Sequence, residues 1–439
     1  MLERLKGIVG DENFSDDKAE LIAYSRDSSI FKERPLCVVT PGSRREIVEI
    51  VNFANEHKVP IIPRGAGTNP CGEVVGKAII LDLTKMDRII EVDVDDMYVI
   101  VQPGVVLDDL NLQLKKEGFF FPPDPASSRV CTIGGMVANN SSGLHAVKYG
   151  TTKDYVLALE VVMADGSVIE TGSRALKSAS GYDITSLLVG SEGTLGIFTE
   201  ITLKILPMPE YTETLVFGLK DLKGLEDVGP KLLKLRPSAF EIMDDICIEA
   251  LTNRYNLDFK GSRIVVIIEF DGTHEGVKNN IKRTKELLDG NILAIDDIWD
   301  YRKKLVPSLI GYKDTVPIPI TEDIGVPVAK VLEAIKKIKE IYGEHGFKVA
   351  IYGHGGDGNL HMRVFVEGAK AEEVTKAADS VYEYVLSIEG TITSEHGIGL
   401  LRAKYMGGEH GGAFEIMAGI KKAFDKNNIM NPGKMGFTY

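Results

Sequence analysis

The chain has 439 residues, of which 44% are hydrophobic and 26% are charged, and it contains 45 glycines. This composition is typical of a globular protein with many loops, and it excludes a disordered or fibrous chain; the length predicts two or three packed units. The net charge of −13 argues against a nucleic-acid partner, and an anionic substrate would need cationic groups inside its own pocket.

The cysteines and the apolar runs indicate the cellular compartment of the protein. Cys37, Cys71, Cys131 and Cys247 are scattered without a Cys-x-x-Cys pair, which excludes a cysteine-ligated iron–sulfur cluster within this chain and predicts a reducing compartment. The first residues, MLERLKGIVGDENF, are charged where a signal peptide is apolar, and no apolar run approaches the roughly 20 residues of a membrane span. We therefore expect a cytoplasmic protein with no direct membrane span.

From residue 35 the chain alternates strands and helices. A helix is predicted over residues 43–58, because Ser43 followed three residues later by Glu46 is the pattern of a capping box. A second helix is predicted over residues 106–118 and ends at Gly118. Strands are predicted around these helices over residues 35–41, 59–65, 78–86 and 88–105.

The first of three glycine-rich loops is Arg64–Gly72 (RGAGTNPCG). It directly follows a predicted strand, and its glycines would let backbone amides come close to a phosphate. Neither a helical pattern nor a Lys-Ser/Thr pair follows, so nicotinamide and nucleotide-triphosphate sites lose support. Taken alone, the loop is equally consistent with an ordinary turn.

The second and third loops point to a long ligand. Residues 119–150 are rich in Pro, Ser, Asn and Gly, and a loop of this length inside a compact unit is either functional or disordered. Its small residues, Thr132–Gly135 and Ala138–Asn140, fit a backbone packed against a large flat ligand. The third loop, Gly190–Ile197, follows a predicted hairpin over residues 158–172. An extended ligand could touch all three loops, and a dinucleotide is long enough.

Two histidines flank a glycine-rich bend in residues 351–366 (IYGHGGDGNLHMRVFV). Apolar alternation on both sides predicts two strands, with His354 and His361 at strand ends beside the same turn. Further along, Glu395 lies next to a third histidine, His396. Two imidazoles, one carboxylate and an open position suit a catalytic divalent metal site. A lone histidine near a strand end is more often only hydrogen-bonded, so this prediction rests on the whole set.

Six motifs, in order, resemble those of the FAD-linked D-2-hydroxy-acid dehydrogenases of the vanillyl-alcohol oxidase / p-cresol methylhydroxylase superfamily. The similarity covers about residues 30–439 and extends to the glycolate oxidases, the D-lactate dehydrogenases and the D-2-hydroxyglutarate dehydrogenases. The motifs are PRGAGT at Pro63–Thr68, TIGG at Thr132–Gly135, GSEGTLGI at Gly190–Ile197, GHGGDGNLH at Gly353–His361, SEHGIG at Ser394–Gly399 and NPGK at Asn431–Lys434.

The resemblance implies an α+β fold with two domains. It implies a two-part FAD-binding domain of the p-cresol methylhydroxylase type over residues 1–210 and an α+β antiparallel-sheet cap domain for the substrate over residues 211–404. The C-terminal segment, residues 405–439, would return to the FAD domain. Alternating strands and amphipathic helices in the second range fit such a sheet, and the active site is expected between cap and flavin.

The resemblance also assigns roles to individual residues. The FAD would contact Arg64, Gly65, Ala66, Gly67, Thr68, Asn69, Pro122, Thr132, Gly134, Gly135, Asn139, Gly143, Glu192, Gly193, Ile197 and Asn431. The metal ligands would be His354, His361 and Glu395, with His396 as catalytic base. Arg302 and Arg363 would bind the substrate carboxylate, although a solvated helix charge is the alternative for Arg302.

Two departures from the family pattern affect these expectations. Asn69-Pro70-Cys71 follow Thr68, where the family continues with small residues and glycines, and Arg363 stands where close relatives often carry Asn. Because no histidine lies in the first loop, we expect FAD to be bound non-covalently. The expected divalent metal is zinc, with manganese or iron as alternatives.

The implied reaction is oxidation of a small D-2-hydroxy acid, D-lactate or glycolate, to the 2-oxo acid by hydride transfer to flavin N5. Electrons would pass to an external acceptor: a quinone, a cytochrome, an electron-transfer flavoprotein, a separate iron–sulfur subunit or oxygen. Two alternatives stay open, an FAD-binding subunit of a larger glycolate oxidase complex and a flavin-free metal hydrolase. A homodimer is also left open.

Overall fold

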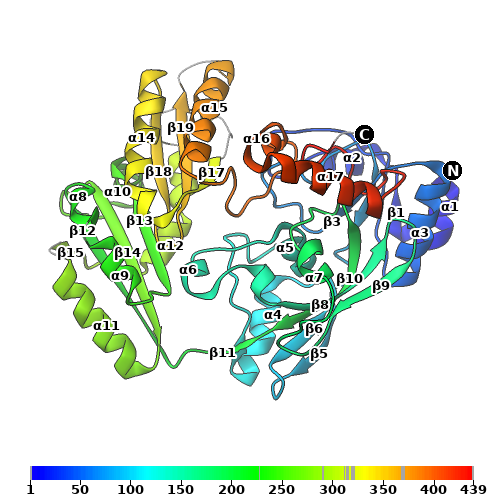
Figure 1. Ribbon diagram of the computed structural model, residues 1–439, viewed down its shortest axis with the longest axis horizontal. Helices are drawn as coiled ribbons and strands as arrows, with labels where there is room; N and C mark the ends of the chain where they lie inside the picture. Colours follow the sequence, from blue (N-terminus) through cyan, green and yellow to red (C-terminus); the bar gives the residue numbers. More distant parts are fainter. Residues whose placement is uncertain are drawn as a thin grey trace. The chain divides into compact units, whose positions relative to one another are not determined.

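The chain folds into two compact units (Figure 1). The computed structural model describes residues 2–226, 228–288, 291–310, 312, 316–317, 322–366 and 371–437. Unit 1 comprises Met1–Ser142, Thr151–Met208 and Glu395–Tyr439; unit 2 comprises Gly143–Gly150 and Pro209–Ser394. The chain thus returns to unit 1 at Glu395 instead of residue 405, and a short segment of the second glycine-rich loop belongs to unit 2.

Unit 1 contains two main sheets, which agrees with the predicted two-part domain. The first has the order β1-β2-β4-β3, with β2, β4 and β3 parallel. The second is antiparallel with the order β5-β6-β10-β8-β9. The strands are β1 (Phe14–Ser15), β2 (Cys37–Val39), β3 (Ile61–Arg64), β4 (Ile79–Asp82), β5 (Ile89–Asp93), β6 (Tyr98–Val101), β8 (Val156–Met163), β9 (Val168–Gly172) and β10 (Gly196–Lys204), besides the short pair β7 (Phe119–Phe120) and β11 (Leu206–Pro207).

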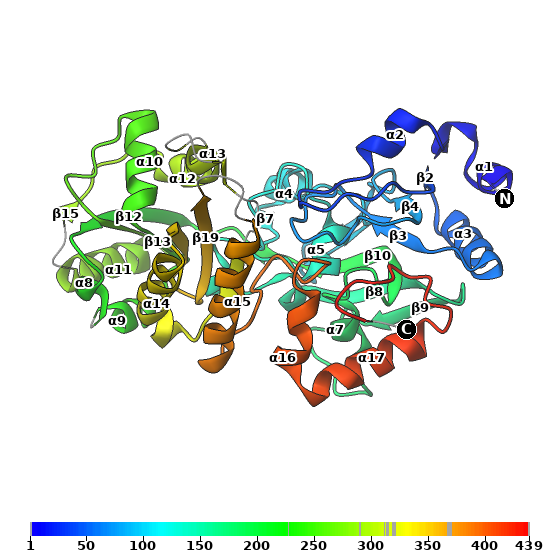
Figure 2. The ribbon, with the colours of Figure 1, turned by 90° about the horizontal axis from the view of Figure 1, so that it is seen from above.

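The helices of unit 1 include the predicted amphipathic helix, α3 (Arg44–His57). Ser43 caps it by accepting from the Glu46 amide at 3.3 Å, and Glu46 Oε2 accepts from the Gly42 amide at 2.7 Å. Its buried face packs with Cys37 and Leu81 in one core, and Figures 1 and 2 show α1 (Leu2–Val9) beside it. The others are α2 (Lys18–Ala23), α4 (Leu107–Leu114), α5 (Ile133–Asn139), α7 (Ile184–Leu188), α16 (Met406–His410) and α17 (Gly412–Phe424).

The second glycine-rich loop is more regular than its sequence predicts. Helix α5 forms within it, with Thr132 as its N-cap, and the one-turn helix α6 (Ala146–Tyr149) follows in unit 2. Helix α5 has only 7 residues and contains Gly134 and Gly135, which lower helix propensity. Tertiary packing outweighs that propensity here.

Unit 2 is built on one antiparallel sheet, as predicted for the cap. Its order is β15-β12-β14-β13-β18-β19-β16, and β17 also pairs with β19. The strands are β12 (Tyr211–Leu219), β13 (Ala239–Met243), β14 (Ile264–Gly272), β15 (Asn291–Ile292), β16 (Val316–Pro317), β17 (Glu322–Gly325), β18 (Lys348–His354) and β19 (Asn359–Val366).

Helices cover both faces of this sheet. Figure 2 shows α10, α12 and α13 on one side and α11 and α14 on the other. The helices are α8 (Lys223–Glu226), α9 (Gly229–Leu233), α10 (Asp245–Tyr255), α11 (His274–Leu287), α12 (Ile298–Lys303), α13 (Leu305–Ile310), α14 (Val331–Glu344) and α15 (Ala371–Ser387). Within the described residues, none of the helices combines the length and the apolar character that crossing a bilayer requires.

Candidate active site

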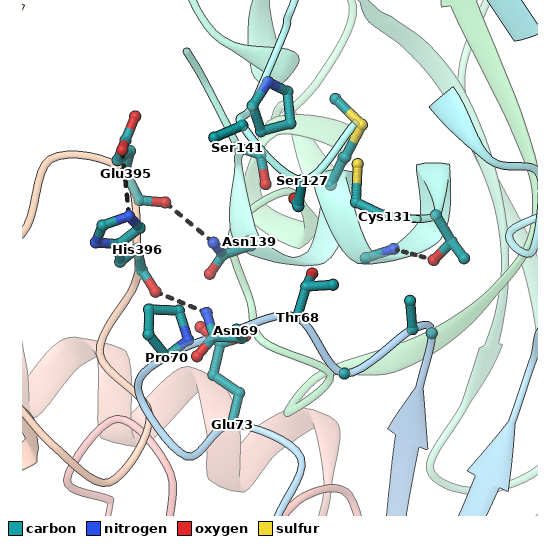
Figure 3. A pocket seen from close by; sticks show the side chains of 18 of the residues that line it. Thr68, Asn69, Pro70, Glu73, Ser127, Cys131, Asn139, Ser141, Glu395 and His396 are labelled. Carbon is teal, nitrogen blue, oxygen red and sulfur yellow. Dashed lines mark hydrogen bonds and ion pairs between the residues drawn. The ribbon is translucent and has the colours of Figure 1, made fainter. Parts of the chain in front are cut away.

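A pocket of about 270 Å³ opens in unit 1 where the predicted cofactor loops meet (Figure 3). A smaller pocket of about 70 Å³ continues it and shares Gly65, Glu73, Thr132 and Gly135 with it. The predicted cofactor residues that line one or both are Arg64, Gly65, Ala66, Gly67, Thr68, Asn69, Thr132, Gly134, Gly135, Asn139, Glu192, Gly193 and Ile197. The fold therefore brings the three glycine-rich loops together into one groove.

Three predicted cofactor residues line neither pocket. Pro122 is buried, and Gly143 begins the segment that belongs to unit 2. Asn431 lies behind the groove, where its side-chain amide donates to the Glu73 and Glu192 carbonyls at 3.0 and 2.7 Å and so ties two loops together. Their assignment as FAD contacts stays a prediction.

The groove also contains residues that the motifs did not single out. Pro125, Ala126, Ser127, Cys131, Ser141 and Ser142 come from the second loop, and Glu73 and Val74 follow the first. For the six residues of the second loop, the only indication in the sequence was that this loop is rich in Pro and Ser. Glu73 carried none, because a single acid after a glycine loop is usually a surface residue.

The groove fits a large flat ligand such as FAD because backbone forms much of its wall. A Cβ on Gly65 would lie 2.2 Å from Thr132 Oγ1, so the two loops can approach this closely only with glycine there. The Arg64 guanidinium donates to the Arg26 carbonyl at 2.9 Å, lies over the Tyr24 ring and packs against Gly67, where a Cβ would lie 2.3 Å from Arg64 Nη2. The guanidinium thus lies beside the first glycine-rich loop, and the assignment of Arg64 as an FAD contact stays a prediction.

One edge of the pocket is formed by Glu395 and His396, whose peptide groups are held by asparagines (Figure 3). Asn139 Nδ2 donates to the Glu395 carbonyl at 3.0 Å, and Asn69 Nδ2 donates to the His396 carbonyl at 2.7 Å. The Glu395 carboxylate and the His396 ring lie 3.2 Å apart. The predicted catalytic base thus lines the predicted cofactor groove on a tethered backbone.

In unit 2, the two other predicted metal ligands come together at the ends of β18 and β19. The rings of His354 and His361 have centroids 5.3 Å apart and are perpendicular, and both side chains are buried. Strand register places Tyr352 opposite His361 and His354 opposite Asn359. The predicted hairpin is present, and its two imidazoles converge.

A carboxylate that the sequence did not reveal orients His354. Glu241 on β13 contacts His354 Nδ1 through one oxygen, while its other oxygen accepts from Arg302 Nε at 2.8 Å and Nη2 at 2.7 Å. Burial raises the pKa of the Glu241 carboxyl, but His354 and Arg302 outweigh it and lower that pKa to about 2. Fixing an imidazole through Nδ1 leaves its Nε2 as the atom that could meet a ligand.

A second buried carboxylate, Asp323 on β17, lies beside His361. It is fully buried and lies opposite His361 in the strand register, 3.9 Å from its Nδ1. The Asp323 carboxylate accepts hydrogen bonds from Asn359 Nδ2 at 2.6 Å and from the Ser394 amide at 3.2 Å. Asn359 therefore ties the start of β19 to β17, and Asp323 also anchors the chain at Ser394, the residue immediately before Glu395.

The two predicted substrate arginines differ in their surroundings. Two nitrogens of Arg302 are taken by Glu241, and its guanidinium lies 4.9 Å from the Tyr352 ring centroid. Arg363 is half-buried on β19, its Nε is buried without a hydrogen-bond acceptor, and no ion pair joins it to any carboxylate in the described part of the chain. Arg363 is thus the cation better placed to accept an anion.

Comparison with known proteins places these features in a family. The family model described as "FAD binding domain" matches residues 35–172, and the one described as "FAD linked oxidases, C-terminal domain" matches residues 208–435. The chain is 34% identical to the glycolate oxidase subunit GlcD of Bacillus subtilis (strain 168), over 99% of this chain and 96% of that protein.

Two further similarities agree. The chain is 34% identical to a D-lactate dehydrogenase of Anaerostipes hadrus, over 99% of this chain and 97% of that protein. Its fold matches a solved structure of 4-ethylphenol oxidase from Gulosibacter chungangensis with a TM-score of 0.80 at 17% identity, covering 99% and 96% of the two chains. The second likeness concerns the fold alone.

Proposed function

Because this chain belongs to the FAD-linked oxidase family, as the D-2-hydroxy-acid dehydrogenases do, we propose that it oxidises a small D-2-hydroxy acid, D-lactate or glycolate, to the 2-oxo acid. The observation that carries the choice of an acid is Arg363, a cation whose Nε has no acceptor, two residues from His361. A guanidinium with an unmet donor favours a bound carboxylate.

The residues divide the chemistry as follows. Arg363, with the remaining Nη1 of Arg302, would hold the substrate carboxylate and fix its orientation. His396 would take the hydroxyl proton as general base. The loops around Gly65 and Thr132 would hold the FAD, which supplies the hydride acceptor when bound.

We also propose that His354, His361 and Glu395 hold a divalent metal, zinc or alternatively manganese or iron. The donor set fits, because Glu241 fixes the ring of His354 and a buried Asp323 supports the other strand. Such an ion, when bound, lowers the pKa of an attached hydroxyl group. His396 would then accept the proton at neutral pH.

The electron acceptor is proposed to be external: a quinone, a cytochrome, an electron-transfer flavoprotein, a separate iron–sulfur subunit or oxygen. The four cysteines of the chain are buried, and none of them forms a disulfide bond. The alternative of a catalytic subunit inside a larger glycolate oxidase complex uses the same site residues. A homodimer and a cytoplasmic location both stay predictions.

An anaerobic titration tests the proposal directly. Purified, FAD-loaded protein is mixed with D-lactate, L-lactate, glycolate or D-2-hydroxyglutarate, with and without a chelator, and the flavin absorbance is followed. We expect bleaching by D-lactate or glycolate that is lost after chelation. Bleaching by none of them without a partner would favour the complex-subunit alternative, and a colourless but hydrolytically active preparation would favour the metal hydrolase.

The base is tested separately with His396→Asn. This variant should keep its bound flavin, because the bond between His396 and the groove residue Asn69 is made by the backbone carbonyl of His396. Its rate of flavin reduction should fall ~10²–10⁴-fold, the usual contribution of a general base. Reduction at nearly the wild-type rate would refute this role for His396.

A further inference from the structure

Within unit 1, the segment Glu395–Gly399 is held almost peptide by peptide. Asn139 and Asn69 donate to the carbonyls of Glu395 and His396, and Arg402 Nη1 donates to the Gly397 carbonyl at 3.0 Å. Glu192 accepts from the amides of Ile398 and Gly399 at 2.6 and 2.9 Å. These bonds fix the backbone on which Glu395 and His396 are carried.

Three side-chain oxygens converge at the centre of this loop. A Cβ built on Gly397, whose φ is +77°, would lie 2.3 Å from Glu73 Oε1, 2.4 Å from Asn139 Oδ1 and 2.9 Å from Glu192 Oε1. Only glycine fits such a site. Figure 3 shows Glu73 and Asn139, which come from separate segments of the chain and line the same pocket.

The hydrogen-bond count around Gly397 leaves a donor missing. Glu192 is satisfied by two amides, whereas Glu73 Oε1 and Asn139 Oδ1 are buried atoms with no donor. Turning the Asn139 amide over would place its nitrogen here but would lose its bond to the Glu395 carbonyl. Buried acceptors without a donor are strongly unfavourable, and a proton on Glu73 would supply the donor to this cluster.

The burial of Glu73 and the charges around it also favour a protonated Glu73 carboxyl. Desolvation by burial raises the pKa of Glu73 well above its ordinary value; Glu192 and Asp27 add to this, and Arg402 and Lys434 oppose it. Burial also lowers the pKa of Lys434 to about 8 although Glu192, Asp27 and Glu73 oppose that change. Two carboxylates in one buried site rarely both ionise.

We propose that Glu73 holds a proton in the folded protein and shares it with the oxygens of Asn139 and Glu192 around Gly397, as a positioning residue for the loop that carries Glu395 and His396. The proton supplies the donor that this cluster lacks. Only the catalytic consequence, through His396, rests on the proposed function; the protonation state does not.

Infrared spectroscopy tests the protonation state without any turnover. The FAD-loaded protein at neutral pH should show a carboxylic-acid C=O band that disappears in Glu73→Gln and persists in the control Glu117→Gln, which removes an exposed acid. If no such band is lost, Glu73 is ionised and paired with Lys434 or Arg402, and the proposal is overturned.

The pH dependence of stability gives an independent readout. An acid whose pKa is raised by folding contributes most below its unfolded pKa, and this contribution is lost as pH rises through the raised pKa. The unfolding free energy of the wild type relative to Glu73→Gln, measured in urea with FAD bound, should therefore fall from pH 5 upward. An increase over that range would mean an ionised, paired Glu73 and would contradict the proposal.

The positioning role is tested by comparing two substitutions. Glu73→Gln keeps an N–H donor toward the cluster and should reduce kcat/KM by less than ~5-fold, about one neutral hydrogen bond. Glu73→Ala removes the donor and should reduce kcat by ~100-fold, as expected for a displaced catalytic group. Equal impairment of both variants would overturn the positioning role, and the infrared result stands even if Glu73→Ala fails to fold.

Discussion

At the scale of single residues, Arg363 gives the sharpest prediction about the substrate. Arg363→Asn removes the guanidinium while keeping a polar side chain, and a charged hydrogen bond contributes about 1.5–3 kcal/mol. We expect kcat/KM for the hydroxy acid to fall ~10–100-fold, mostly through KM, with partial recovery in Arg363→Lys. The control, Arg263→Asn, changes an exposed arginine of unit 2. Steady-state kinetics that show equal effects at both positions would remove Arg363 from the substrate site.

The buried Glu241 predicts a pH effect on stability. Its pKa falls from 4.5 to about 2 in the folded state, which corresponds to about 3 kcal/mol of stabilisation. Because the folded pKa is depressed, this stabilisation is present above the unfolded pKa and is lost as pH falls toward about 2. Urea unfolding should show the gap between the wild type and Glu241→Gln closing between pH 5 and pH 2. A constant gap, as expected for the exposed control Glu333→Gln, would show that Glu241 is not ionised in the folded protein.

Site residues that are close together along the chain could be predicted from the sequence, whereas residues brought together from distant parts of the chain could not. His354 and His361 flank one turn, so their spacing alone predicted that they converge. Glu241 is 113 positions away from His354 along the chain, and only the pairing of β13 with β18 brings them together. Glu73 depends in the same way on a loop more than three hundred residues later.

At the scale of elements, the segment Gly143–Gly150 forms a strap that we define by its bonds to β14. Lys148 donates to the Asp271 carbonyl at 3.0 Å and pairs with its carboxylate, and Tyr149 OH donates to the same carboxylate at 2.5 Å. His145 Nε2 lies 2.9 Å from Glu269 Oε1. The strap directly follows Ser141 and Ser142, which line the cofactor groove.

Asp271→Asn should loosen this strap. Losing a partly buried charged bond of about 1.5–3 kcal/mol raises the population of locally open states ~10–100-fold. Trypsin should therefore cut after Lys148 faster than in the wild type by at least ~10-fold, measured by mass spectrometry over time. The control Asp258→Asn, an exposed residue of the same unit, should leave that rate unchanged. Unaltered cleavage in Asp271→Asn would mean that the strap is held by other contacts.

Elements were predictable where local signals and tertiary packing agree. Helix α3 begins at its cap and buries a regular apolar face, and both features are visible in the sequence. Helix α5 was concealed because Gly134 and Gly135 weaken it, and the reason for one of those glycines is tertiary: a Cβ on Gly134 would lie 2.5 Å from the Pro103 Cβ. Where glycines serve packing, propensity predicts a loop.

At the scale of the whole molecule, the chain passes between its units at residues 142–143, 150–151, 208–209 and 394–395. Two of these passages border the cofactor groove, one at Ser142 and one at Glu395. Neither domain is therefore a simple stretch of sequence, which is why motifs predicted the family and the two units but not where the chain returns.

The mode of FAD attachment is a property of the whole loaded protein. Cys131 lines the groove, so it is the cysteine to consider for a covalent bond to the flavin. Burial, only partly offset by a hydrogen bond with Ser127, raises the pKa of its thiol to about 11. Since the thiolate is the nucleophile, we expect no bond to the flavin. Acid denaturation and centrifugation should release all of the FAD into the supernatant, and Cys131→Ser should bind FAD as the wild type does. A yellow pellet, with a chain mass increased by that of FAD in the wild type but not in Cys131→Ser, would instead establish covalent attachment at this cysteine.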